Sequence, residues 1–152
     1  MDEVRLSLLK SEMEAQIRAI DEIYIRIEAR RKNLEDQTQW ESLAYQLHNL
    51  YCAFEDLFKI VADYFENTIE DRVKYHSELL RRMSIHIEGI RPSLLTDEAF
   101  GLLDGLRGFR HFFRHAYGYE IDPRKVKIVL EDALRLKGLY KDLVANFIEK
   151  LA

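Results

Sequence analysis

The placement of helix-breaking residues constrains this chain more than any other feature. All six glycines and both prolines lie at or after Gly89, so the whole preceding part of the chain contains neither. Apolar residues recur three and four positions apart almost throughout, which is the period of a helix with one buried face. No competing strand pattern occurs. We therefore predict an all-α fold, an up-and-down bundle of about five helices.

The ends of these helices are predicted from capping signals and turn residues. Thr96 is the expected N-cap of the fourth helix. Asp122 and Pro123 supply an N-cap followed by proline at the first helical position of the fifth helix. A short polar turn separates the first two helices. The expected helices cover residues 3–33, 39–67, 69–89, 97–117 and 123–150.

The third helix is expected to continue as far as Gly89 because Ile87 and Ile90 keep the three-four spacing. Gly89 and then Pro92 should stop it. His76 falls on the same apolar stripe. A lone histidine in such a position is more often a hydrogen-bonded interior residue than a ligand, so we assign it no chemistry.

Length and composition limit the classes of function. The chain has 152 residues, of which 47% are hydrophobic, as expected for a single domain covering residues 1–152. No apolar run could span a bilayer and no signal peptide is evident, so we expect a soluble, cytosolic protein without a membrane partner. The net charge of −4 excludes nonspecific coating of nucleic acid, and any RNA site must be local. The single cysteine, Cys52, is expected to be a small buried hydrophobic residue without a role.

Cationic and aromatic residues crowd together between Gly108 and Gly118, where the fourth helix is expected to end with Gly118 just beyond it. The run reads GFRHFFRHAYG. Within it, Arg110, His115 and Tyr117 form the pattern R-x4-H-x-Y. This pattern and its flanking residues resemble the signature of the HepT toxins, which are small ribonucleases of the HEPN superfamily.

The chain also contains a decoy for the shorter form of this pattern. Arg81 and His86 have the same R-x4-H spacing, but Ile87 and Glu88 follow instead of the x-Tyr pair. Only the longer pattern, in its aromatic and basic surroundings, therefore distinguishes the family signature from a chance match. The alternative at the level of residues is that the basic run is a solvated or salt-bridged helix face.

The resemblance implies a function. It implies a metal-independent ribonuclease toxin without a cofactor, working as a homodimer in a type VII-like toxin–antitoxin pair. Arg110 and His115 would be catalytic, RNA would be the substrate, and an MNT-type nucleotidyltransferase antitoxin would transfer AMP to Tyr117. The added AMP would place negative charge beside the arginines that bind RNA phosphates.

Helix geometry raises a question about the catalytic pair. Five residues make nearly one and a half turns, so Arg110 and His115 lie about 140° apart on a regular helix. Either the helix distorts near its end, or both residues border a groove into which Arg110 reaches, or a second copy of the chain completes the site. A twofold dimer would place one His115 from each subunit at its axis and so supply both an acid and a base.

Other residues of the basic run are expected to assist. Arg107, His111 and Arg114 are candidates for binding neighbouring RNA phosphates. His111 and His115 have a spacing of four that could hold a metal, but no third ligand is evident, so we predict no metal site. Phe112 lies off the expected core face and is a candidate subunit contact.

The second helix carries an adjacent pair of carboxylates, Glu55 and Asp56, in its otherwise apolar sequence. Adjacent helical residues point about 100° apart, so the pair is not an acid–base dyad by spacing. We favour solvation or a salt bridge to the basic helix. The alternative is that one of them orients Arg110 or His115 from a second shell.

Two further functions remain open from the sequence. A helical interaction module, such as a dimeric adaptor, would need the long helices and nothing from His115. A HEPN-fold protein without catalysis would act as a nucleotide-binding partner of a nucleotidyltransferase and would keep Tyr117 and Arg110.

Overall fold

The computed structural model describes residues 2–65, 74–118 and 120–151. In these residues all regular structure is helical apart from one isolated bridge, which confirms the all-α prediction. None of the described helices combines the length and the apolar character that crossing a bilayer requires. The helices are α1 (Glu3–Arg30), α2 (Gln37–Phe65), α3 (Tyr75–Met83), α4 (Asp97–Arg114), α5 (Pro123–Lys137) and α6 (Tyr140–Leu151).

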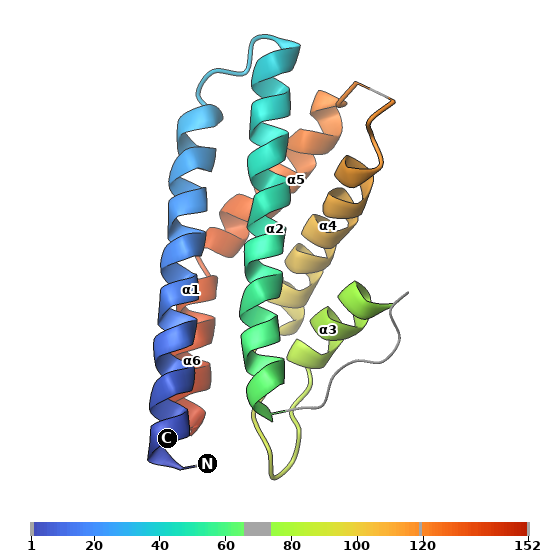
Figure 1. Ribbon diagram of the computed structural model, residues 1–152. Helices are drawn as coiled ribbons and strands as arrows, with labels where there is room; N and C mark the ends of the chain where they lie inside the picture. The colour runs from blue at the N-terminus through green and yellow to red at the C-terminus, as the bar shows by residue number, and fades with distance from the viewer. Residues whose placement is uncertain (1, 66–73, 119, 152) are drawn as a thin grey trace.

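The long helices run alternately up and down (Figure 1). α1 and α2 form an antiparallel pair, α4 returns beside α2, and α5 crosses behind α2 towards α1, where α6 continues to the C-terminus. The short α3 lies across the lower part of the bundle. The chain ends lie together at the bottom of this view, whereas the C-terminal end of α4 lies near the top.

α2 lies at the centre and packs against α1, α3, α4 and α5. It has a wide apolar face, because most of its large apolar residues are fully buried. Burying such a side chain contributes about 1.5–3 kcal/mol. The residues of α2 with 2% exposure or less are Leu43, Ala44, Leu47, Leu50, Tyr51, Phe54, Leu57, Phe58 and Val61.

The helix starts are fixed by local hydrogen bonds. At α2, Asp36 Oδ1 accepts the Gln39 N–H at 2.9 Å while Gln39 Oε1 accepts the Asp36 N–H at 3.1 Å, a reciprocal capping box. The predicted N-cap Thr96 is confirmed, with its hydroxyl oxygen accepting a first-turn N–H at 3.2 Å. Asp122 caps α5 in front of Pro123, also as predicted.

The predicted end of the third helix is wrong. α3 ends at Met83, six residues before the expected Gly89, and its expected start lies outside the described residues. The chain then forms a tight turn in which the N–H groups of Ile87 and Arg91 each donate to the other residue's carbonyl oxygen. Gly89 has φ +76° in this turn, a conformation that favours glycine. The glycine shapes a turn between helices and does not end a helix.

Arg91 explains why α3 stops early, because its side chain binds carbonyls in the last turn of the helix and just after it. The residue is 2% exposed. Its guanidinium donates to the carbonyl oxygens of Arg82 at 2.9 Å and of Ile85 and Pro92 at 3.0 Å. The Arg91 guanidinium therefore satisfies backbone carbonyl oxygens that would otherwise need the N–H groups of another helical turn.

We expect Arg91→Ala to lower the free energy of unfolding by about 2–4 kcal/mol, because buried carbonyls lose charge-assisted hydrogen bonds. Urea unfolding followed by circular dichroism measures the loss. Arg124→Ala is the matched control, since the Arg124 side chain is 89% exposed and its ion pair with Asp122 contributes little. Equal stability of the Arg91 and Arg124 variants would contradict this role for Arg91.

The predicted single helix over 123–150 is also divided. α5 ends at Lys137, and Gly138 and Leu139 donate their N–H groups to carbonyls three residues earlier, at 3.2 and 2.9 Å. This tighter bonding ends α5, and α6 begins at Tyr140. The change of direction brings α6 against α1. The described residues therefore contain six helices where about five were expected.

Candidate active site

Arg110 lies on α4 at its contact with α2. The neighbouring core residues Leu106 and Phe109 are buried and hold this part of α4 against the bundle. The side chain of Arg110 is half-buried, and its Nε atom is buried with no hydrogen-bond partner among the described residues. A cationic group is therefore positioned at the α2–α4 interface with unused donor capacity.

His48 and Cys52 of α2 adjoin Arg110. The Cys52 Sγ atom lies 3.9 Å from His48 Nε2, and Cys52 is half-buried. Burial raises the pKa of the Cys52 thiol, but the neighbouring His48 imidazole and the charge of Arg110 outweigh it, and the net pKa is lowered. The same contact with Cys52 raises the pKa of His48 against the effect of its burial. Cys52 is thus part of a polar cluster, and our prediction of a buried hydrophobic residue is wrong.

Tyr51 extends this cluster into the core. It is fully buried, and its hydroxyl has no hydrogen-bond partner within the described part of the chain. Burial raises its pKa, Glu55 raises it further, and the nearby charges of Arg107 and Arg110 oppose the rise. His48, Tyr51 and Cys52 were not predicted as site residues. Their spacing of three and four along α2 was the available signal.

His115 lies outside the helix, where α4 ends at Arg114. His115 is the C-cap residue and donates its N–H to the Phe112 carbonyl at 3.2 Å. The side chain is exposed, and its ring centroid lies 4.6 Å from that of His111. Our prediction that α4 reaches Tyr117 is therefore wrong by three residues. No hydrogen bond joins His115 to Arg110 among the described residues.

The other residues of the motif region differ in their environments. Arg114 is exposed, whereas Arg107 is half-buried and forms an ion pair with Asp104 at 2.9 Å. Tyr117 is 94% exposed and lies beyond the end of α4. Phe112 is half-buried, with the ammonium group of Lys125 positioned 4.2 Å from its ring centroid.

The two carboxylates of α2 pair with groups other than the predicted catalytic residues. Glu55 is 3% exposed and lies 2.8 Å from His76 Nδ1 and 3.8 Å from Lys59 Nζ. Asp56 is exposed and lies 3.8 Å from the same Lys59 ammonium. Neither forms a hydrogen bond or ion pair with the motif residues among those described.

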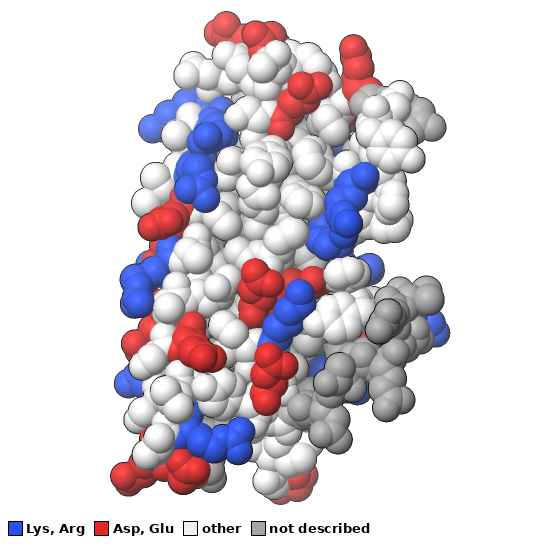
Figure 2. Space-filling model, viewed as in Figure 1, with Lys and Arg blue, Asp and Glu red and all other residues white. Residues whose placement is uncertain are grey.

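The surface charge around α4 is local. Figure 2 shows a strip of basic side chains over the upper part of α4, and acidic groups near the top of α2. Acidic groups lie over the lower half of α2. The decoy pair has separate partners, with Arg81 bound to Glu78 and His86 lying 3.3 Å from Glu88.

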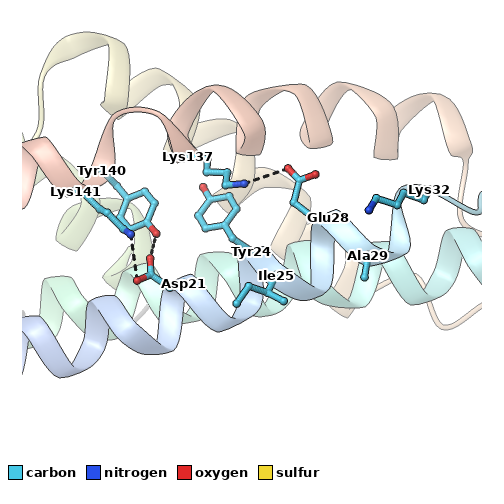
Figure 3. A pocket seen from close by; sticks show the side chains of 9 residues that line it. All are labelled: Asp21, Tyr24, Ile25, Glu28, Ala29, Lys32, Lys137, Tyr140 and Lys141. Atoms are coloured by element: carbon cyan, nitrogen blue, oxygen red, sulfur yellow. Dashed lines mark hydrogen bonds and ion pairs between the residues drawn. The ribbon is translucent and has the colours of Figure 1, made fainter.

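A cavity of about 690 Å³ lies elsewhere, between α1 and the junction of α5 and α6. Several of its polar groups pair with one another, as Figure 3 shows: Lys137 with Glu28, and both Lys141 and Tyr140 with Asp21. It contains none of the motif residues. No set of three metal-binding side chains comes together in the described ranges of the chain.

Comparison with known proteins identifies a family. A family model described as "HepT-like protein" matches residues 42–151, which include most of α2, all of α3 to α6 and the whole motif. Neither the curated proteins nor the solved structures contain a significant match to the chain.

Proposed function

Since the chain belongs to the HepT-like protein family of the HEPN superfamily, we propose that it is a metal-independent ribonuclease toxin. The observation that carries this proposal is the placement of the motif. Arg110 is held at the α2–α4 interface with an unsatisfied donor, and His115 is exposed at the end of the same helix. A phosphate group could accept a hydrogen bond from Arg110, and an RNA chain could reach His115.

The proposed reaction is attack by the ribose 2′-hydroxyl on the neighbouring phosphorus. A histidine takes the 2′-OH proton, the 2′-oxygen bonds to phosphorus, and the bond to the 5′-oxygen breaks as an acid protonates that oxygen. The products are a 2′,3′-cyclic phosphate and a 5′-hydroxyl end. Arg110 binds the phosphate and offsets the negative charge that develops on its oxygens.

The reaction needs a base and an acid, and we propose that a homodimer supplies both. One exposed His115 from each protomer would meet across a twofold axis near the ends of the two α4 helices. This arrangement also accounts for the lack of a hydrogen bond between Arg110 and His115 within the described residues of one chain. His111 and Arg114 are exposed and suited to neighbouring phosphates, whereas Arg107 would have to leave Asp104.

We also propose that the activity is controlled by a nucleotidyltransferase antitoxin that transfers AMP to Tyr117. The 94% exposure of this side chain supports the proposal, because a second enzyme must reach the phenol oxygen. The adduct would bring a phosphodiester anion near the basic residues of α4.

The purified protein should therefore cleave RNA in the presence of EDTA, at the same rate as without it, and leave 2′,3′-cyclic phosphate ends. Mass spectrometry of the fragments identifies the ends. The decoy variant Arg81→Ala should cleave like the unchanged protein, because Arg81 is bound to Glu78 on α3. Cleavage that stops in EDTA would refute the metal-independent mechanism. RNA or nucleotide binding without cleavage would favour the non-catalytic partner of a nucleotidyltransferase.

A further inference from the structure

An aromatic pair, exposed Tyr45 and half-buried His48, lies on α2 beside the proposed active site. Tyr45 is 53% exposed, one of the few large hydrophobic side chains that the described surface leaves open. Its ring lies nearly parallel to that of His48, with an interplanar angle of 14° and 6.5 Å between centroids. Packing of the core does not require an aromatic residue at this position, because Ala44 and Gln46 are buried and Tyr45 is not.

His48 connects Tyr45 to the cationic residues of α4. Its Nδ1 lies 3.3 Å from Asn49 Oδ1, its Nε2 contacts Cys52, and its ring centroid lies 5.1 Å from that of Phe113 on α4. These contacts on different sides hold the imidazole in place. His48 also lies close enough to Arg110 for the two charges to interact. The aromatic pair and the proposed phosphate-binding arginine therefore form one continuous surface.

We propose that Tyr45 and His48 form a base-stacking subsite for single-stranded RNA, with the exposed face of Tyr45 receiving a base next to the phosphate bound by Arg110. The inference rests on the proposed function and adds to it the residues that receive a base. Aromatic rings beside a basic strip are the combination with which proteins bind unpaired nucleic acid, because every base offers a flat face and every linkage a charge.

The charge distribution favours RNA as the occupant of this surface. The strip on α4 beside α2 is basic, and acidic groups in the view of Figure 2 lie near the top of α2 and over its lower half. A strand crossing from α2 to α4 would place its base on the aromatic part and its phosphate on the basic part. A duplex keeps its bases stacked inside and cannot use Tyr45 in this way.

Binding to a fluorescent single-stranded oligoribonucleotide tests the inference, measured by anisotropy in the His115→Ala background so that the RNA stays intact. Alanine substitution at a stacking aromatic weakens binding by about 1–3 kcal/mol, or about 5- to 150-fold. We expect Tyr45→Ala to raise the dissociation constant by such a factor, and Tyr45→Phe, which keeps the ring, to change it by less than about twofold. In the active protein, Tyr45→Ala should raise KM and leave kcat nearly unchanged.

An abasic nucleotide placed at successive positions of the oligoribonucleotide locates the stacked base. At one position the abasic nucleotide should weaken binding to the protein that contains Tyr45. It should have no further effect in Tyr45→Ala, because the missing base and the missing ring remove the same stacking contact. Ile25→Ala is the control for losing an exposed hydrophobic side chain, since Ile25 is 68% exposed on α1.

The outcomes separate this inference from the function on which it rests. If His115→Ala binds RNA and Tyr45→Ala binds it equally well, the subsite is refuted and the ribonuclease proposal stands. If Tyr45→Ala instead dissociates the dimer in sedimentation while RNA affinity is kept, Tyr45 is a subunit contact and the inference is wrong. If no RNA is bound even with Tyr45 present, and none is cleaved by the active protein, both proposals fail.

Discussion

Replacing His115 by alanine is expected to slow RNA cleavage by about 10²–10⁴-fold, the usual contribution of one acid–base residue. The effect should fall on kcat, because the imidazole transfers protons in the transition state and contributes little to binding. His115 is exposed at the end of α4, so its loss should leave the thermal unfolding midpoint nearly unchanged. Single-turnover cleavage of a labelled RNA measures the rate.

Matched variants make this test specific. His86→Ala should behave like the unchanged protein, because this decoy histidine is exposed in the turn after α3 and lies beside Glu88. Arg110→Ala should lose as much activity as His115→Ala, but its side chain is half-buried, so its stability must be measured alongside. If His86→Ala were the inactive variant and His115→Ala were active, the site would be assigned to the wrong part of the chain.

Replacing Tyr117 by phenylalanine is expected to abolish AMP transfer completely, because the phenol oxygen is the only atom of this side chain that can form the bond. The protein, ATP, Mg²⁺ and a cognate MNT-type nucleotidyltransferase should together yield one or more AMP additions on a peptide containing Tyr117. Mass spectrometry detects the additions. The unmodified Tyr117→Phe protein should remain an active ribonuclease that the antitoxin can no longer silence by modification.

Tyr119 is the control for this assignment. It is only two positions away and equally aromatic, although it lies outside the described residues. Tyr119→Phe should still accept AMP and should still be silenced. An adduct that persists in Tyr117→Phe would show that another residue is modified, and the absence of any adduct would favour inhibition by simple binding.

The starts of the helices were easier to predict than their ends. Thr96 and Asp122 cap α4 and α5 through their own side chains and the next few residues, so the signal is local in sequence. The end of α3 depends on Arg91, which reaches back to carbonyls that precede it by six and nine residues. Apolar periodicity continued past that point, although Ile90 is 51% exposed. A pattern of spacing cannot reveal a side chain that folds back on the helix.

The candidate site shows the same difference between local and long-range signals. The positions of Arg110, His115 and Tyr117 were read from one short motif on one helix. His48 and Cys52 were missed because their importance comes from α4, which packs against them from more than fifty residues away in the sequence. The role of such polar residues on an otherwise apolar helix can be recognised only when the helix that packs against them is known.

The match to the family begins at residue 42, after α1 has ended. Yet α1 covers one side of α2 with a continuous apolar stripe, and its inward-facing residues are almost completely buried. They are Leu9, Met13, Ile20, Ile23, Tyr24 and Ile27. A fragment trimmed to the matched residues would expose the apolar side of α2 to water and should aggregate. The segment that the family model matches is therefore shorter than the segment that the buried core of the bundle requires.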